Sequence, residues 1–372
     1  MTTAPILPPS PATDDLSRFC CLNPDCPTYG QRGAGNLTVC ARYGKQHRRL
    51  LYCRSCKDRF SERKGTPLFG CKLPDEKALD VLAHLADGCG VRQTGRLVGV
   101  TKDTAAHYAA RAGGHARQLH DELVGLSPLT TKVQVDEKWS FVGKKEKNRD
   151  PGKPADDLKG DCWDHVALDP DSRLVLEVAV GPRTAEMARS LLEGVKGRLG
   201  GRTPELITSD EYAAYPEVIL EVFGEEVTPP RTGKPGRPAG PRTVPPEGMC
   251  YATVHKTREK GRVVSVEERV IFGELPAGTK ASTSYLERRN GTDRHRNARK
   301  GRKTYRFSKE WDVHESMTHF TQLSYNFCWP VRTLAEKDES GRKQPRTPAM
   351  VAGLTDHVWS LAEWITLPGV QR

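Results

Sequence analysis

Three acidic residues in separate stretches could do chemistry together. Asp136 ends a β-branched run in TKVQVDEKWSFVG, and Asp210 ends the apolar run of ELITSDEYAAY. Glu287 lies in STSYLERRNGTDRHR, where we expect a helix directly ahead of a basic stretch. A carboxylate shielded from water is costly unless it is paired, protonated or bound to a cation. Three of them together would suit two Mg²⁺ (or Mn²⁺) ions, which can activate the attacking oxygen and stabilise the leaving oxygen of a phosphodiester.

Each acid has competitors. A single strand-end acid is usually satisfied by a nearby lysine or backbone N–H, without any ion. Glu137 and Glu211 each follow a candidate aspartate, and because neighbours on a strand point to opposite faces, only one of each pair should reach the ions. We choose the aspartates for their shorter side chains. Glu287 comes 77 residues after Asp210, and that interval contains three other acids: Glu267, Glu268 and Glu274.

The cysteines near the N-terminus are spaced for a metal. Cys21-x4-Cys26 and Cys53-x2-Cys56 form two knuckles separated by a basic stretch, and tetrahedral Zn²⁺ takes two sulfur ligands from each such knuckle. The segment has too little apolar material to fold without metal. Free buried thiols are the alternative, and Cys20 could replace Cys21. The spacing predicts a structural zinc without indicating what the ribbon binds, since zinc ribbons bind DNA, RNA and protein.

The sequence after the cysteines, over 74–125, predicts three helices joined by two turns. Its third helix should begin after Thr101 as N-cap and present Lys102, Thr104 and His107 at its front. That placement is typical of a recognition helix entering a DNA major groove. A three-helix bundle that binds nothing is the alternative.

The basic residues are concentrated in two stretches. The net charge is +11, and nine Lys/Arg against two acids lie between Arg42 and Lys64, with ten against one between Arg288 and Lys309. Cationic stretches of this kind suit a polyanion, because each neutralised phosphate releases counterions. A solvated basic face is the alternative. From the second stretch we expect five residues to contact DNA: Arg288, Arg294, Arg296, Arg299 and Lys300.

The elements that must position these residues follow an α/β pattern. We expect a disordered tail over 1–18, a cysteine-rich ribbon over 19–70 and a helical domain over 74–125. An α/β domain over 130–330 should contain three strands after residue 131, a helix capped by Thr184, a hairpin turning at Lys-Gly and a long helical stretch from 283 to 329. A loop or insertion interrupts it at 228–248, where seven prolines and four glycines occur. A tail over 331–372 carries a short amphipathic helix.

Other features exclude some classes of protein. No apolar run reaches membrane-spanning length and no signal peptide is recognisable, so we expect a cytoplasmic protein associated with the nucleoid. Trp139 and Phe141 alternate with Lys138 along a strand, which favours core packing over stacking on DNA. Tyr285 lacks the upstream Arg/His cluster that a tyrosine recombinase would need.

The ordered set of motifs resembles the DDE-type bacterial insertion-sequence transposases, in particular the insertion-sequence-one family and its relatives. The matching text is CLNPDC…YCRSCKDRFSERKGTPLFG, VDEKWSFVGKK, SDEYAAYPEV, TSYLERRNGTDRHRNARKGRKTYRFSKEWDVHESM and SYNFCWP…TPAMVAGLTDHVWSLAE, from about residue 20 to 365. The resemblance implies a zinc ribbon and helix-turn-helix before an RNase H-like catalytic domain. It also implies Asp136, Asp210 and Glu287 as the magnesium-binding catalytic triad, and Cys21, Cys26, Cys53 and Cys56 as zinc ligands.

By that resemblance the protein is a DNA transposase that binds the terminal inverted repeats of its element, cleaves a phosphodiester and joins the freed end to target DNA. Double-stranded DNA is the expected partner, no membrane is involved, and a homo-oligomer on DNA is expected because two ends are cut together. Two other functions stay open. One is an RNase H-like nuclease without strand transfer. The other is a DNA-binding regulator that has lost the chemistry.

Overall fold

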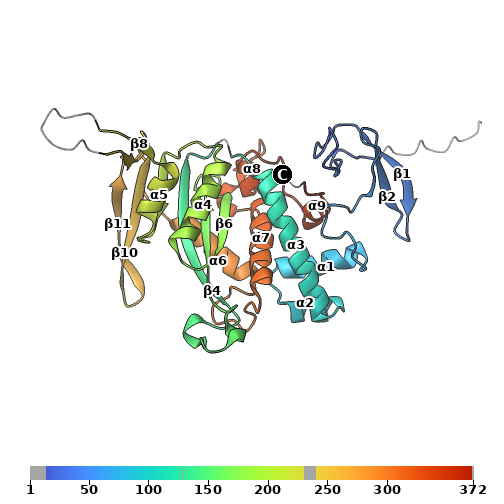
Figure 1. Cartoon of the computed structure of the whole chain (residues 1–372), viewed down its shortest axis with the longest axis horizontal. Helices are drawn as coiled ribbons and strands as arrows, with labels where there is room; N and C mark the ends of the chain where they lie inside the picture. The colour runs from blue at the N-terminus through green and yellow to red at the C-terminus, as the bar shows by residue number, and fades with distance from the viewer. Residues whose placement is uncertain (1–13, 128, 230–239, 371–372) are drawn as a thin grey trace, which may run out of the picture. The chain divides into compact units, whose positions relative to one another are not determined.

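The computed structural model describes residues 14–127, 129–229 and 240–370 (Figure 1). The start of the expected tail at 1–18, and residues 230–239 of the expected insertion, lie outside the described residues. The chain forms two compact units. One combines the described part of Met1–Lys72 with the C-terminal segment that starts at Glu363, and the other is Leu73–Ala362.

The first unit contains a small antiparallel sheet of three strands: β1 (Leu37–Tyr43), β2 (Arg48–Cys53) and β3 (Arg59–Ser61). The C-terminal segment is hydrogen-bonded to this unit. The backbone N–H of Gly369 donates to the carbonyl of Gly65 (2.9 Å), and Arg32 donates to the carbonyl of Pro368 (2.5 Å). A segment that we expected to belong to a separate tail therefore packs with the cysteine-rich region.

Three helices open the second unit: α1 (Asp75–Ala86), α2 (Val91–Val98) and α3 (Lys102–Leu123). Thr101 caps α3 as expected, since its hydroxyl accepts the backbone N–H of Thr104 (3.1 Å). After its exposed first turns α3 packs along α7 (Trp311–Cys328), and at the crossing a Cβ on Gly113 would lie 2.2 Å from the carbonyl oxygen of Ser316. Only glycine allows so close an approach.

A six-stranded mixed sheet forms the centre of the second unit, in the order β11-β10-β7-β4-β5-β6. Strands β4 (Lys132–Val142), β5 (Gly160–Leu168) and β6 (Val175–Gly181) are antiparallel neighbours. Strand β7 (Leu206–Ser209) runs parallel to β4 and to β10 (Cys250–Glu259), and β11 (Arg262–Phe272) returns antiparallel. This mixed α/β architecture is compatible with an RNase H-like fold.

The two faces of the sheet are covered by different helices. Glu137 contacts Tyr215 at the start of α5 (Tyr215–Phe223), which packs beside α4 (Ala185–Arg198). The preceding strand residue, Asp136, contacts Asn290 on α6 (Ser284–Arg296). Because consecutive strand residues point to opposite faces, α5 and α6 lie on opposite sides of the sheet. Thr184 caps α4 as expected, accepting the backbone N–H of Met187 (3.4 Å).

The prediction of one long helical stretch from 283 to 329 is wrong in one respect, because this stretch forms two helices. Helix α6 ends at Arg296, and α7 (Trp311–Cys328) begins 15 residues later. Asn297 ends α6 because its buried side-chain amide donates to the Met317 carbonyl and the Thr321 hydroxyl on α7 (both 3.3 Å). The hairpin turn at Lys260-Gly261 is confirmed, and both residues have positive φ, as a tight hairpin turn requires.

The remaining elements are short. Strands β8 (Glu225–Val227) and β9 (Arg242–Val244) pair with each other on either side of 230–239. The others are β12 (Glu336–Lys337), β13 (Lys343–Gln344), α8 (Pro348–Val351), α9 (Leu361–Ile365) and three single 3₁₀ turns at Glu146–Asn148, Pro154–Asp156 and Arg332–Leu334. Within the described ranges, no helix is both long and apolar enough to cross a lipid bilayer.

Candidate active site

Asp136 lies within β4 rather than at a strand end, so that expectation is wrong. The parallel ladder from β4 to β7 stops at Gln134, whereas the antiparallel ladder to β5 continues to Val142. Asp136 is therefore paired on one side only. Its two carboxylate oxygens accept the backbone N–H of Glu137 (2.9 Å) and the side-chain amide of Asn290 (2.8 Å). The strand and α6 together fix the direction of this carboxylate.

Asp210 and Glu287 come from two other elements. Asp210 directly follows β7, its Oδ1 accepts the backbone N–H of Tyr212 (3.2 Å), and its Oδ2 lies 4.0 Å from the guanidinium of Arg183. Glu287 is in the first turn of α6, where Oε1 accepts hydrogen bonds from the Thr283 hydroxyl (2.7 Å) and from Lys256.

These three acids line one cavity of about 560 Å³. Four cations also line the cavity: Lys256, Arg258, Arg294 and Arg302. The other lining residues are mostly polar: Glu211, Val254, His255, Thr283 and Asn290. The structure thus brings together an acidic floor and a cationic rim from β4, β7, β10, α6 and the segment after α6. Carboxylates are the ligands that a hard cation prefers, and Lys/Arg side chains are the partners that an anionic substrate prefers.

The electrostatics show that negative charge accumulates around Asp136. Burial, and after it the neighbouring charges of Asp210, Glu137 and Glu287, raise the pKa of Asp136 to about 7. Like charges that crowd a half-buried carboxyl disfavour its ionised form. Burial opposes ionisation of Glu287 too, but hydrogen bonds from Lys256 and Thr283 lower its pKa. Carboxylate oxygens are the ligands that Mg²⁺ prefers. In the described residues, however, the three carboxylates do not form a group whose ligand atoms all lie within 4.8 Å of one another, so a shared ion would have to draw them closer.

The neighbouring acids are engaged elsewhere. Glu137, on the opposite face of the sheet, accepts hydrogen bonds from Tyr215 and from Arg183 (2.9 Å). Glu211 lines the cavity but pairs with His255 (2.5 Å) and Arg269 (2.7 Å). The competitors of Glu287 are not among the residues that line the cavity: Glu267, Glu268 and Glu274. Glu267 pairs with Arg269, and Glu268 accepts the backbone N–H of Ala281.

The four cysteines Cys21, Cys26, Cys53 and Cys56 form a second candidate site. Their sulfur atoms all lie within 4.8 Å of one another, and this is the one group of three or more His, Cys, Asp or Glu placed to hold a metal ion in the described part of the chain. Cys20 is outside it. Burial opposes ionisation, but backbone N–H groups and neighbouring thiols lower the pKa of Cys53 to about 6. Such a cluster of thiols could bind zinc.

The residues expected to contact DNA fall into three groups. Lys102 and His107 on α3 and Arg288 on α6 are exposed, and Thr104 is half-buried. Arg294 lines the acidic cavity, and Arg296 pairs with Asp87 near the end of α1.

Arg299 and Lys300, by contrast, are buried and cannot contact phosphate in this conformation, so these two expectations are wrong. Lys300 donates to Asp164 on β5 (2.6 Å) and to Thr318 on α7 (2.6 Å).

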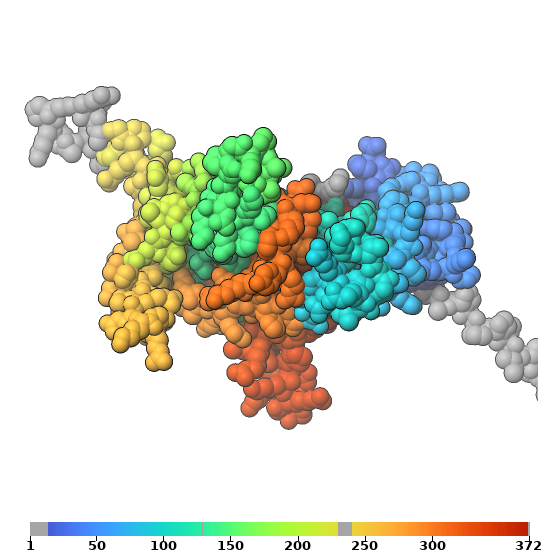
Figure 2. Space-filling view, turned by 90° about the horizontal axis from the view of Figure 1, so that it is seen from below, coloured from blue at the N-terminus to red at the C-terminus, as the bar shows by residue number. Residues whose placement is uncertain are grey.

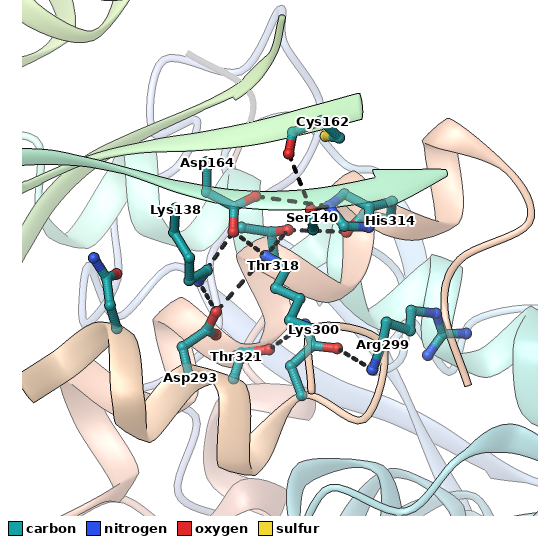
Figure 3. Close-up of polar contacts among 12 residues, drawn as sticks. Lys138, Ser140, Cys162, Asp164, Asp293, Arg299, Lys300, His314, Thr318 and Thr321 are labelled. Carbon is teal, nitrogen blue, oxygen red and sulfur yellow. Dashed lines mark hydrogen bonds and ion pairs between the residues drawn. The ribbon is translucent and has the colours of Figure 1, made fainter. Parts of the chain in front are cut away.

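Lys300 belongs to a buried polar network that the sequence analysis missed (Figure 3). Lys138 on β4 lies between Asp164 on β5 (3.0 Å) and Asp293 on α6, and all three side chains are almost fully excluded from water. His314 on α7 extends the network through Ser140 (3.2 Å) and Ser308 (2.9 Å). The sequence did contain a pattern that could have predicted this network. Glu287, Asn290 and Asp293 recur every three residues on α6, and all face β4 or the cavity.

Comparison with known proteins adds little. No family model matches the chain, and no curated protein matches it. Among solved structures, the Mos1 strand transfer complex is similar at 16% identity over 40% of this chain and 56% of that chain, with a TM-score of 0.17. A pre-cleavage Mos1 transpososome gives 17% identity, 41% and 58% coverage, and a TM-score of 0.17. The chain thus spans little more than half the length of these proteins, and the overlap is too slight to carry an argument.

Proposed function

We propose that this protein is a DNA transposase whose acidic cavity cleaves and rejoins phosphodiesters with divalent metal. The observation that carries the proposal is the shared cavity of Asp136, Asp210 and Glu287, which come from β4, β7 and α6 and face a cationic rim. Magnesium or manganese bound there would supply Lewis-acid activation of the attacking and leaving oxygens.

The protein's own residues would bind and orient the DNA. Arg258, Arg294 and Arg302 on the rim are placed to hold backbone phosphates next to the acids. Asn290 donates to Asp136 and would hold that carboxylate in one direction. Holding the reacting groups in place and neutralising developing charge are the main requirements of phosphodiester chemistry. The same site would direct first water and then the freed 3′-hydroxyl.

We further propose that the first unit and α3 recognise the terminal inverted repeats. The four-cysteine cluster would be closed by a structural zinc ion, and the exposed Lys102 and His107 would meet the DNA groove. The domain assignments of ribbon, helix-turn-helix and RNase H-like catalytic domain, and assembly as a homo-oligomer on two element ends, belong to the same proposal.

One observation favours a second candidate, a DNA-binding regulator without catalysis. Lys256 forms an ion pair with Glu287, so a cation of the protein itself already occupies one member of the acid trio. In an active enzyme, metal would have to displace this lysine from Glu287. In a regulator, the lysine would stay there permanently.

Incubating the protein with labelled element-end DNA and target DNA in Mg²⁺ tests the proposal. We expect strand-transfer products from the wild type and a loss of at least about 100-fold with Asp136→Asn, because one carboxylate ligand of the metal is lost while DNA binding is retained. The matched control is Glu217→Gln on the exposed face of α5, which should cut normally. Cleavage without joining would indicate the nuclease, and DNA binding without any cleavage would indicate the regulator.

A further inference from the structure

A group of three aromatic side chains lies at one end of the sheet, with Phe141 and Phe307 half-buried and Trp139 exposed, against the expectation that Trp139 packs in the core. The odd-numbered face of β4 is buried under helices at Val133 and Val135, but Trp139 farther along the strand is 36% exposed. The Trp139 ring lies 5.8 Å from Phe141, which lies 4.7 Å from Phe307 (centroid distances). We call these three rings the aromatic shelf.

Lysines accompany the aromatic shelf. The Lys145 ammonium lies 5.5 Å from the Trp139 centroid and 5.8 Å from that of Phe141, and Lys309 lies 3.1 Å from the Phe307 centroid. Neither lysine forms an ion pair with a carboxylate of the described chain. The acid that follows Lys145, Glu146, is held by Arg149 (2.7 Å). The shelf therefore combines aromatic rings with lysines that lie over their faces and that pair with no carboxylate of the described chain, so the lysines can turn to an anion and leave the rings to a base.

Phe307 ends a segment, residues 301–307, that we call the basic strap. It has three cations and no acid in the sequence GRKTYRF, and its Tyr305 is 97% exposed. A tyrosine so fully in water has no packing role in the chain itself. In the space-filling view an orange strip, the colour of residues near 300, crosses the surface (Figure 2).

Buried anchors hold both ends of the basic strap. Lys300 before it is bonded to Asp164, as described above. Ser308 after it accepts the backbone N–H of Gly143 with its carbonyl (2.8 Å) and bonds His314 with its hydroxyl (2.9 Å). These anchors, together with the contact of Phe307 with Phe141, hold the strap while Tyr305 stays exposed.

The basic strap runs from the acidic cavity, on the face of β4 that carries Asp136, past the end of that strand to the aromatic shelf on its odd-numbered face. Arg302 lines the cavity and Phe307 belongs to the shelf, and five residues span at most about 18 Å. That is the reach of a few nucleotides. Within a duplex both faces of each base are covered by its neighbours, so aromatic rings can stack only on bases that are unpaired.

We propose that the aromatic shelf and Tyr305 bind unpaired bases of the DNA strand whose phosphate lies in the acidic cavity. This rests on the proposed function and adds to it a single-strand subsite. The strap cations would hold phosphates between the two places, and the rings would hold bases with little sequence preference. A second copy of this chain, docked through the exposed rings, is the competing occupant.

The test uses the full-length protein without added Mg²⁺, so that binding is read separately from cleavage. Fluorescence anisotropy would compare three labelled probes: a 12-nucleotide oligothymidylate, an abasic strand of equal length and a duplex of equal length. We expect Trp139→Ala and Tyr305→Ala each to weaken oligothymidylate binding by roughly 5- to 100-fold. Duplex binding should change less than about twofold, and Trp139→Phe should bind nearly as the wild type. Leu158→Ala is the control, since Leu158 is a 78% exposed apolar residue outside the shelf and strap.

Three results would overturn the proposal. Unchanged oligothymidylate binding in both alanine variants would remove the subsite. Equal binding of oligothymidylate and abasic strand by the wild type would leave only phosphate contacts. A change in oligomeric state without a change in strand affinity would assign the shelf to a second copy. Failure of the shelf would leave metal-dependent cleavage through Asp136 intact, whereas failure of cleavage would leave these binding curves readable.

Discussion

At Asp136 the folded protein holds a carboxyl whose ionisation it disfavours. The pKa is raised from 3.8 to about 7, so the folded state binds a proton that the unfolded state has already lost between these pH values. The stability linked to this proton is fully present below about pH 4 and is lost as pH rises through 7. At neutral pH the carboxylate therefore destabilises the chain until a cation compensates it.

Replacing Asp136 with Asn should reveal this cost. Without added Mg²⁺, we expect the variant to gain stability relative to wild type as pH rises from 5 to 8. About two pH units separate pH 5 from the pKa of Asp136 in the folded state, and each is worth about 1.36 kcal/mol, so the gain should be about 1–3 kcal/mol. Urea denaturation at both pH values measures it, and Mg²⁺ should then stabilise only the wild type. A variant whose advantage is the same at pH 5 and pH 8 would contradict the electrostatic account.

Comparing Lys300 with Lys303 tests whether the buried lysine of the basic stretch stabilises the fold instead of contacting DNA. Lys300→Met would leave Asp164 buried with one partner fewer, and breaking a buried pair in this way costs about 3–5 kcal/mol. Lys303 is exposed, so Lys303→Met should change stability by less than about 0.5 kcal/mol. Chemical denaturation compares the two variants directly. Equal, small effects would mean that Lys300 is not a structural residue.

At the scale of helices and strands, periodic patterns in the sequence predicted the elements, but nothing in it predicted contacts between residues far apart in the chain. The caps Thr101 and Thr184 and the Lys260-Gly261 turn were predictable because their chemistry is complete within a few neighbouring residues. The burial of Lys300 depends on Asp164, 136 residues away in sequence. The acids of the cavity could be predicted from their settings. Asn290 and Lys256, which hold them, could not, because their contacts exist only once α6 packs beside β4 and β10.

The crossing of α3 and α7 offers a matched pair of glycines. In Gly113→Ala the new methyl would meet the Ser316 carbonyl at 2.2 Å, so the helices must separate, at a cost of about 1–3 kcal/mol. Gly114 has no atom within 4 Å of a built Cβ, and Gly114→Ala should instead stabilise the helix by about 0.5–1 kcal/mol. Opposite shifts of the urea midpoint would confirm that α3 packs on α7. Shifts of the same sign would contradict it.

At the scale of the whole molecule, the two units do not follow the order of the chain, because the first unit combines segments from both ends of the sequence. The first unit takes its strands and cysteines from the N-terminal region and its last segment from the C-terminal end. Sequence patterns predicted the cysteine cluster because all four ligands lie within 36 residues. They could not predict the addition from the far end, since contacts such as Gly369 with Gly65 leave no periodic signal.

Removing the chain after Ala362 should therefore weaken the first unit and leave the second intact. The truncation exposes the surface that Val370 covers at Gly30 and removes the hydrogen bonds of Gly369 and Pro368. Because such a small unit has a limited core, we expect amide exchange in β1–β3 to rise by at least about 10-fold, with less than about twofold change in β4–β7. Hydrogen exchange with excess zinc present separates lost packing from lost metal. Equal acceleration in both units would mean that the C-terminal segment stabilises the whole chain, and no acceleration would mean that the cysteine-rich unit folds without it.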